Sequence, residues 1–162
     1  MKKTLLLIPL FLLNNLFGHC QIPCGIYDDV VRIVSIEKDI STILKSIDKI
    51  EQLSTTKGKQ SAQDYNQLVR WINNKETHAQ KIQDVISGYF LSQRIKPVSS
   101  DDPGFSKYVN ITTTCQKLIY YAMKCKQNVD TKDVEILSLT LTELVNLYFD
   151  EHGKDHLKEV RN

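Results

Sequence analysis

The sequence has few residues that interrupt helices, since its 162 residues include only 6 glycines and 4 prolines. It also has no stretch of useful length in which apolar and polar residues alternate, which is the pattern that predicts half-buried strands. Hydrophobic residues make up 41% of the chain and charged residues 25%, as is typical of a globular protein. The length suits one domain, or one domain preceded by a leader.

The sequence also lacks the short motifs that identify many enzymes, because it contains no P-loop, GxSxG, HExxH or EF-hand pattern. It has no excess of one charge either. Without Lys2 and Lys3, which fall in a leader segment, the 21 basic side chains become 19, equal to the 19 acidic ones. Nucleic-acid and membrane-surface binding depend mostly on positive charge. We therefore expect no nucleic-acid partner, and no membrane partner once the leader is removed.

The first eighteen residues differ in kind from the rest of the chain. A basic start, Met1-Lys2-Lys3, precedes an almost wholly apolar stretch from Thr4 to Leu13, and the small residue Gly18 ends the segment. This order is typical of a secretory signal peptide. The apolar stretch is shorter than the roughly 20 residues that a transmembrane helix needs. We expect cleavage after Gly18, and export to the periplasm or secretion. Removing 18 of the 162 residues leaves 144.

Apolar residues recur every three or four positions in four segments of the remaining chain, which is the spacing of amphipathic helices. The four segments are residues 33–50, 61–90, 105–126 and 131–148. Asp28 and Asp29 are placed to cap the first segment, and Asp130 or Thr131 to cap the fourth.

Four amphipathic helices in a chain of this length predict an all-α fold, in the form of an antiparallel four-helix bundle over residues 28–150. Residues 151–162 are polar, and we expect them to form a frayed C-terminal tail. Residues 19–27 precede the first helix and are expected to form a separate metal-binding hook.

The hook is the stretch HCQIPCGIY, which begins the chain once the leader has been removed. The α-amine of His19, the amide nitrogen of Cys20 and the thiolate of Cys20 are each separated by two carbons, so they can close two fused five-membered chelate rings. Cys24 can supply a fourth donor if the chain turns back, which Pro23 favours and Gly25 permits. The resulting planar N2S2 set points to Ni(II) or Cu(II). Nickel is favoured because two thiolates tend to reduce copper.

The imidazole of His19 can reach an axial position above the same plane. Ni(II) is content with four planar ligands, whereas Ni(III) prefers five or more. An axial imidazole therefore suits a one-electron cycle, and anionic thiolates with a deprotonated amide stabilise the oxidised metal.

The hook resembles the nickel hook of the nickel-containing superoxide dismutases, whose pattern is H-C-x-x-P-C-G-x-Y. Every fixed position is matched, by His19, Cys20, Pro23, Cys24, Gly25 and Tyr27. The resemblance implies a four-helix-bundle subunit in a homohexamer, with one nickel per subunit bound by His19, Cys20 and Cys24. It implies Ni(II)/Ni(III) cycling that converts superoxide to dioxygen and hydrogen peroxide. It also implies a Tyr27 hydroxyl near the vacant axial side, where it helps to place the anion.

The same resemblance implies that a glutamate early in the first helix, and an arginine further along, hold the axial imidazole. Glu37 is the candidate glutamate, although the first helix is about one residue out of step with the family. The arginine has no counterpart in the corresponding region, residues 74–79, which offers Lys75, Glu76 and His78 instead.

Two other functions are open. The hook could belong to an exported nickel or copper carrier without turnover, which needs no axial imidazole. Cys20 and Cys24 could instead form a disulfide in a helical interaction domain without metal, as exported cysteine pairs commonly do.

The remaining cysteines and histidines have no ligand spacing. Cys115 and Cys125 are ten residues apart on one helix, which separates them by ~15 Å and prevents a disulfide. We expect both to be buried as small hydrophobic residues. His78, His152 and His156 are expected to be surface or packing residues.

Overall fold

The computed structural model describes residues 27–55, 58 and 60–161. These residues form five α-helices and one π-helix, and no strand is found among them. The elements are α1 (Asp29–Ser54), α2 (Ala62–Asp84), η1 (Val85–Arg94), α3 (Phe105–Gln127), α4 (Thr131–Tyr148) and α5 (Glu151–Arg161). The prediction of an all-helical fold is confirmed.

The helix starts follow the local sequence. Asp28 caps α1, because its carboxylate accepts a hydrogen bond of 3.0 Å from the backbone nitrogen of Val31. Ser61 caps α2 through a reciprocal capping box with Asp64. Asp130 caps α4. The predicted caps Asp28 and Asp130 are therefore confirmed.

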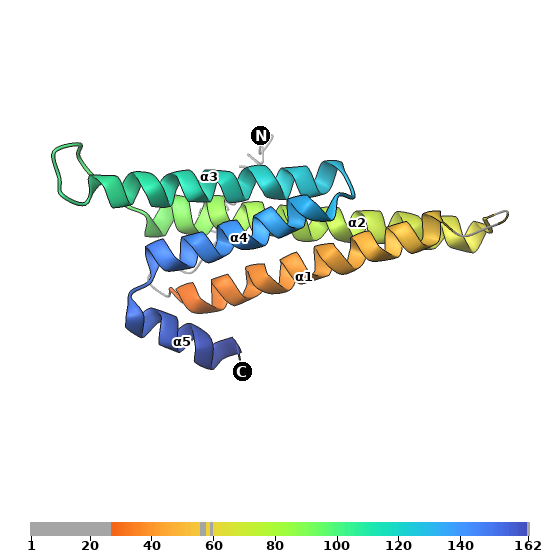
Figure 1. Ribbon diagram of the computed structural model, residues 1–162, viewed down its shortest axis with the longest axis horizontal. Coiled ribbons are helices and arrows are strands. Elements are labelled where there is room, and N and C mark those ends of the chain that lie inside the picture. The colour runs from red at the N-terminus through yellow and green to blue at the C-terminus, as the bar shows by residue number, and fades with distance from the viewer. Residues whose placement is uncertain (1–26, 56–57, 59, 162) are drawn as a thin grey trace, which may run out of the picture.

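The four long helices run side by side, each in the direction opposite to its neighbour in sequence (Figure 1). Helix α1 packs against α2 and α4, and α3 packs against α2 and α4. The C-terminal end of α1 and the N-terminal end of α2 extend beyond the α3–α4 pair (Figure 1).

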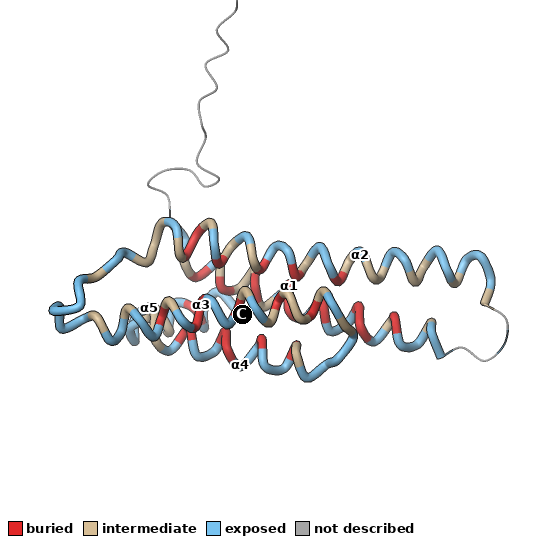
Figure 2. Tube along the Cα trace, turned by 90° about the horizontal axis from the view of Figure 1, so that it is seen from above, coloured by how far each residue is buried: buried red, intermediate tan, exposed pale blue. Residues whose placement is uncertain are grey.

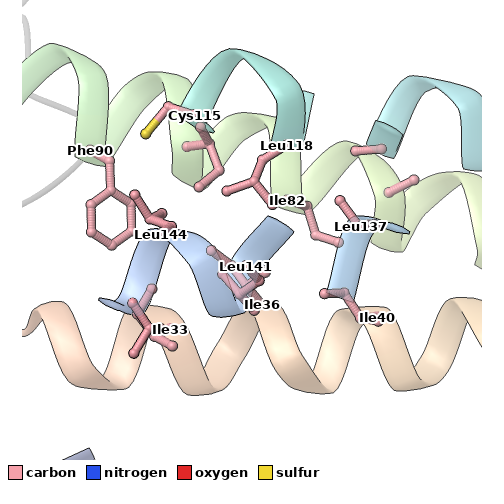
Figure 3. Close-up of a cluster of buried hydrophobic side chains, with 14 of the residues drawn as sticks. Ile33, Ile36, Ile40, Ile82, Phe90, Cys115, Leu118, Leu137, Leu141 and Leu144 are labelled. Carbon is pink, nitrogen blue, oxygen red and sulfur yellow. The ribbon is translucent and has the colours of Figure 1, made fainter. Parts of the chain in front are cut away.

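A single apolar core lies between these helices. In α1 it is built from isoleucines spaced by three or four, and all of these are buried: Ile33, Ile36, Ile40, Ile43, Ile47 and Ile50. Leu137, Leu141 and Leu144 of α4 face the same interior as Ile82, Phe90 and Leu118 (Figure 3). Buried positions follow the inner sides of the long helices (Figure 2), as the periodicity of the sequence predicts.

The expectation of a frayed C-terminal tail is wrong. Residues 151–161 form α5, which packs against α1. Leu157 is 1% exposed, and Arg161 forms an ion pair with Glu37 of α1. One buried leucine and one ion pair hold this otherwise polar segment against α1. Its polar composition therefore did not predict a packed helix.

The helix predicted over residues 61–90 is divided. It continues as a π-helix from Val85 to Arg94, in which the Ser92 hydroxyl donates to the carbonyl of Ser87 and the Ile95 nitrogen donates to that of Phe90.

Among the described helices, none is long and apolar enough to cross a membrane.

Candidate metal centre

The predicted nickel ligands His19, Cys20 and Cys24 lie outside the described residues, so the ligand set stays a prediction. The described chain begins at Tyr27, the last residue of the hook motif. Its side chain is 41% exposed and lies at the start of α1. The surroundings of Tyr27 therefore form the base from which the hook extends.

At this base, the carboxylate of Asp29 accepts four hydrogen bonds, two on each oxygen. Oδ1 of Asp29 accepts hydrogen bonds from the Tyr89 hydroxyl at 2.6 Å and from Nε of Arg94 at 2.8 Å. Oδ2 accepts from Nη2 of Arg94 at 2.7 Å and from the Tyr148 hydroxyl at 2.8 Å. The group formed by Asp29, Tyr89, Arg94 and Tyr148, called the Asp29 cluster below, joins α1, η1 and α4.

The Asp29 cluster contacts Tyr27 directly. The guanidinium carbon of Arg94 lies 4.4 Å from the centroid of the Tyr27 ring, in a cation–π arrangement. The Tyr89 ring meets Tyr27 edge to face, with centroids 5.9 Å apart and planes at 69°. Arg94 thus binds Asp29 through two nitrogens and packs against Tyr27 at the same time.

Burial and hydrogen bonding fix the charges in the cluster. Burial acts to raise the pKa of Asp29, but the hydrogen bonds from Arg94, Tyr89 and Tyr148 together outweigh it and lower that pKa. Burial, followed by the bond to Asp29, raises the pKa of Tyr148 to about 12 and also raises the pKa of Tyr89. The bond to Asp29 raises the pKa of Arg94. At neutral pH the carboxylate and guanidinium are charged and both phenols keep their protons.

The π-helical geometry brings Tyr89 and Arg94 to the same carboxylate. These residues are five positions apart, which is the repeat of π-helical hydrogen bonding, whereas residues three or four apart are neighbours on an α-helix. Short π-helical stretches often occur at functional sites. Tyr89 and Arg94 were not predicted as site residues, because an α-helical pattern does not place them together.

Glu37, the predicted partner of the His19 imidazole, has a different partner among the described residues. Both of its carboxylate oxygens accept hydrogen bonds from Arg161 of α5, one of them at 3.2 Å from Nε. Two of the residues that the sequence offers in place of the arginine also have other partners. Lys75 is buried and donates to the carbonyls of Cys125 and Lys126, and Nδ1 of His78 lies 2.6 Å from Oδ1 of Asp39. Among the described residues, two arginines lie at the hook end: Arg94, which contacts Tyr27, and Arg32 of α1, whose guanidinium carbon lies 5.3 Å from the centroid of the Tyr89 ring.

The other potential metal ligands do not assemble into a site. Cys115 and Cys125 are free and buried, as predicted. Burial raises the pKa of the Cys115 thiol to about 12 and, with the charge of Asp133, that of Cys125 to about 11. His152 and His156 lie on α5. Within the part of the chain that the structure describes, no three His, Cys, Asp or Glu side chains are grouped so as to hold a metal ion.

The family model described as nickel-containing superoxide dismutase matches residues 14–152. That range contains all six fixed positions of the hook motif and the helices from α1 to α4. Neither a curated protein nor a solved structure matches the chain.

Proposed function

We propose, given that the chain belongs to the nickel-containing superoxide dismutase family, that it converts superoxide to dioxygen and hydrogen peroxide at a nickel ion bound by residues 19–27. Membership of the family makes the protein an oxidoreductase with a nickel cofactor. The observation that carries the proposal is the family match over residues 14–152, which spans a hook with all six fixed residues present.

The donor chemistry of the hook fits nickel. The amine and imidazole of His19, the amide nitrogen of Cys20 and the thiolates of Cys20 and Cys24 would hold the nickel, because nitrogen and thiolate donors suit that metal. Cys115 and Cys125 are poor alternatives, because the thiolate is the form that binds metals and burial raises both of their pKa values. Nickel bound there would supply a one-electron cycle between Ni(II) and Ni(III), by which one superoxide loses an electron to give dioxygen and a second gains an electron and two protons to give hydrogen peroxide.

The residues of the chain place the substrate and the ligands. We assign to the Tyr27 hydroxyl the role of helping to position the superoxide anion beside the nickel. Its ring lies at the start of α1 and packs against Arg94 and Tyr89, which gives the hook a defined point of attachment to the helical domain.

The proposal extends to processing and assembly. We assign residues 1–18 to a signal peptide whose removal after Gly18 frees the amine of His19, and we place the protein in the periplasm or outside the cell. The subunit is assigned as an antiparallel four-helix bundle that forms a homohexamer, each subunit holding one nickel. The family match does not favour the alternative of a metal carrier without turnover.

The sharpest test changes the terminus and leaves every side chain in place. One alanine is inserted between Gly18 and His19, so that His19 contributes an amide nitrogen instead of an amine. We expect the variant to fold and to keep nickel through its thiolates, because soft sulfur ligands are retained. We also expect it to lose superoxide turnover and the Ni(III) signal in electron paramagnetic resonance.

The matched control replaces His19 with alanine and keeps the free terminus. His19→Ala keeps planar Ni(II), since the amine, amide and thiolates remain, but it lacks the axial imidazole and also loses the Ni(III) signal. Parental turnover in the alanine-extended protein would show that the amine is not a ligand and would contradict the proposed site. Mass spectrometry of each preparation establishes the residue at which the chain starts.

A further inference from the structure

Tyr27 lies at the junction between two parts of the molecule. It ends the hook motif, and Asp28 immediately after it caps α1. Its side chain is 41% exposed, so the core does not enclose it. An exposed tyrosine has two freely rotating side-chain bonds unless a neighbour restrains it. Within the described part of the chain, the ring contacts that can restrain Tyr27 are those with Arg94 and Tyr89.

Arg94 is suited to restrain this ring because it is itself held in place. Its Nε and Nη2 bind the two oxygens of Asp29 at 2.8 and 2.7 Å, a bidentate geometry that fixes the plane of the guanidinium. Asp29 is fixed in turn by the hydroxyls of Tyr89 and Tyr148 at 2.6 and 2.8 Å. The side chain of Asp29 is 15% exposed and that of Arg94 30% exposed, so the pair is shielded from much of the solvent.

We propose that Arg94, held by Asp29, is a positioning residue that fixes the Tyr27 ring at the base of the hook and so sets where the Tyr27 hydroxyl lies. This inference rests on the proposed function for its effect on catalysis, although the restraint of the ring itself does not depend on bound metal. Arg94 acts through Tyr27 and has no contact with substrate in this proposal. A lysine cannot replace it, because an ammonium has no planar fork with which to bind Asp29 and stack on a ring.

The first measurement uses the metal-free protein labelled with 3-fluorotyrosine, with the Tyr27 resonance assigned by its absence in Tyr27→Phe. In the parental protein we expect this ¹⁹F resonance to differ from that of free 3-fluorotyrosine. In Arg94→Met we expect it to move to the free position, while the other tyrosine resonances away from the cluster stay in place. Arg70→Met is the matched control, since Arg70 is exposed on α2 and outside the Asp29 cluster.

The second measurement is a double-mutant cycle on the nickel-loaded protein. Arg94→Met is expected to lower kcat/KM for superoxide about ten-fold, since cation–π contacts and bidentate pairs contribute at that level. In the Tyr27→Phe background, which lacks the hydroxyl to be positioned, Arg94→Met is expected to change kcat/KM by less than about two-fold. Nickel content is expected to remain at one ion per chain in all four proteins.

Three results would overturn the proposal: an unchanged Tyr27 resonance in Arg94→Met, additive effects in the cycle, or loss of nickel from Arg94→Met. If Arg94→Met does not fold, Arg94→Lys decides by the same measurements, because it keeps a positive charge beside Asp29 and lacks the planar fork. Failure of the proposed function looks different. It appears as absence of turnover in the nickel-loaded parental protein, while the ¹⁹F comparison still tests the restraint of Tyr27.

Discussion

Asp29 occupies the first position of α1, where a carboxylate is favoured by the positive end of the helix dipole. Its side chain is used for tertiary contacts, because the neighbouring Asp28 already caps the helix. A carboxylate can accept about four hydrogen bonds, and Asp29 has four. Two adjacent acidic residues that look equivalent in the sequence therefore have different roles, one in helix capping and one in joining three elements.

Cys115 allows a prediction that separates packing from metal binding. Its side chain is fully buried in the core between α3 and its neighbours. Cys115→Ser places a hydroxyl among apolar groups, and we expect it to lower the free energy of unfolding by about 1–3 kcal/mol. Denaturant unfolding measures this loss. The nickel content and the nickel absorption spectrum are expected to be unchanged.

The matched variant is Cys115→Ala, which removes the sulfur without adding a polar group and should be destabilised by a smaller amount. Cys20→Ser and Cys24→Ser are expected to abolish nickel binding, because a hydroxyl does not replace a thiolate ligand. Loss of nickel in Cys115→Ser would contradict the assignment of the metal site to residues 19–27.

At the scale of elements, the packing of α5, which the sequence did not predict, can be tested by substitution. Leu157 is its one buried residue and packs into the core from a helix that is otherwise polar. Leu157→Ala is expected to lower the free energy of unfolding by about 2–4 kcal/mol, the usual cost of truncating a buried leucine. Val160 is 37% exposed on the same helix, so Val160→Ala should change stability by less than about 0.5 kcal/mol. Equal stability of Leu157→Ala and the parental protein would indicate that residues 151–161 fray in solution.

The elements also show which features of the fold the sequence predicts. The isoleucine repeat of α1 and the caps Asp28 and Asp130 are local signals, and they predicted α1 and α4 correctly. Helix α5 was missed because a single leucine does not make a periodic pattern. The π-helix was missed because apolar spacing through Tyr89 and Phe90 fits a continuous α-helix, and the hydrogen bonds between residues five apart that define a π-helix cannot be read from that spacing.

The candidate site likewise has one part that is contiguous in the sequence and one part whose residues lie far apart in it. The hook motif is contiguous, so a nickel site at residues 19–27 could be predicted from sequence alone. The family match confirms the nickel cofactor, and the assignment of its ligands to these residues stays a prediction. The Asp29 cluster is assembled from residues 60, 65 and 119 positions away from Asp29. No local pattern connects them, and it is the packing of η1 and α4 against the start of α1 that brings them together.

At the scale of the whole molecule, the Asp29 cluster links the beginning of the helical domain to its later elements. Asp29 belongs to α1, Tyr89 and Arg94 to η1, and Tyr148 to the last turn of α4. These contacts lie at the end of the helical domain to which the hook is attached. The stability of the domain and the placement of Tyr27 therefore depend on the same carboxylate.

This dependence predicts how acid affects the whole molecule. The pKa of Asp29 is lowered in the folded protein from an ordinary value of 3.8, so the unfolded chain binds its proton first as the pH falls. The stabilisation from Asp29 is therefore fully present above about pH 4 to 5 and is lost as the pH falls through the folded pKa. Asp29→Asn removes the charge and keeps the shape. We expect this variant to be less stable than the parental protein by about 2–4 kcal/mol at pH 7, since hydrogen bonds to a charged group are lost.

The lowered pKa of Asp29 also predicts how the difference in unfolding free energy between Asp29→Asn and the parental protein changes with pH. Below the folded pKa the parental Asp29 is protonated and resembles the neutral asparagine, so the difference in unfolding free energy should shrink as the pH falls through that pKa. Asp48→Asn, on an exposed position of α1, is the control and should differ little from the parental protein at any pH. Denaturant unfolding followed by circular dichroism at a series of pH values measures all three proteins. A difference between Asp29→Asn and the parental protein that stays constant from pH 7 down to the lowest pH at which both proteins fold would mean that the charge of Asp29 does not stabilise the fold.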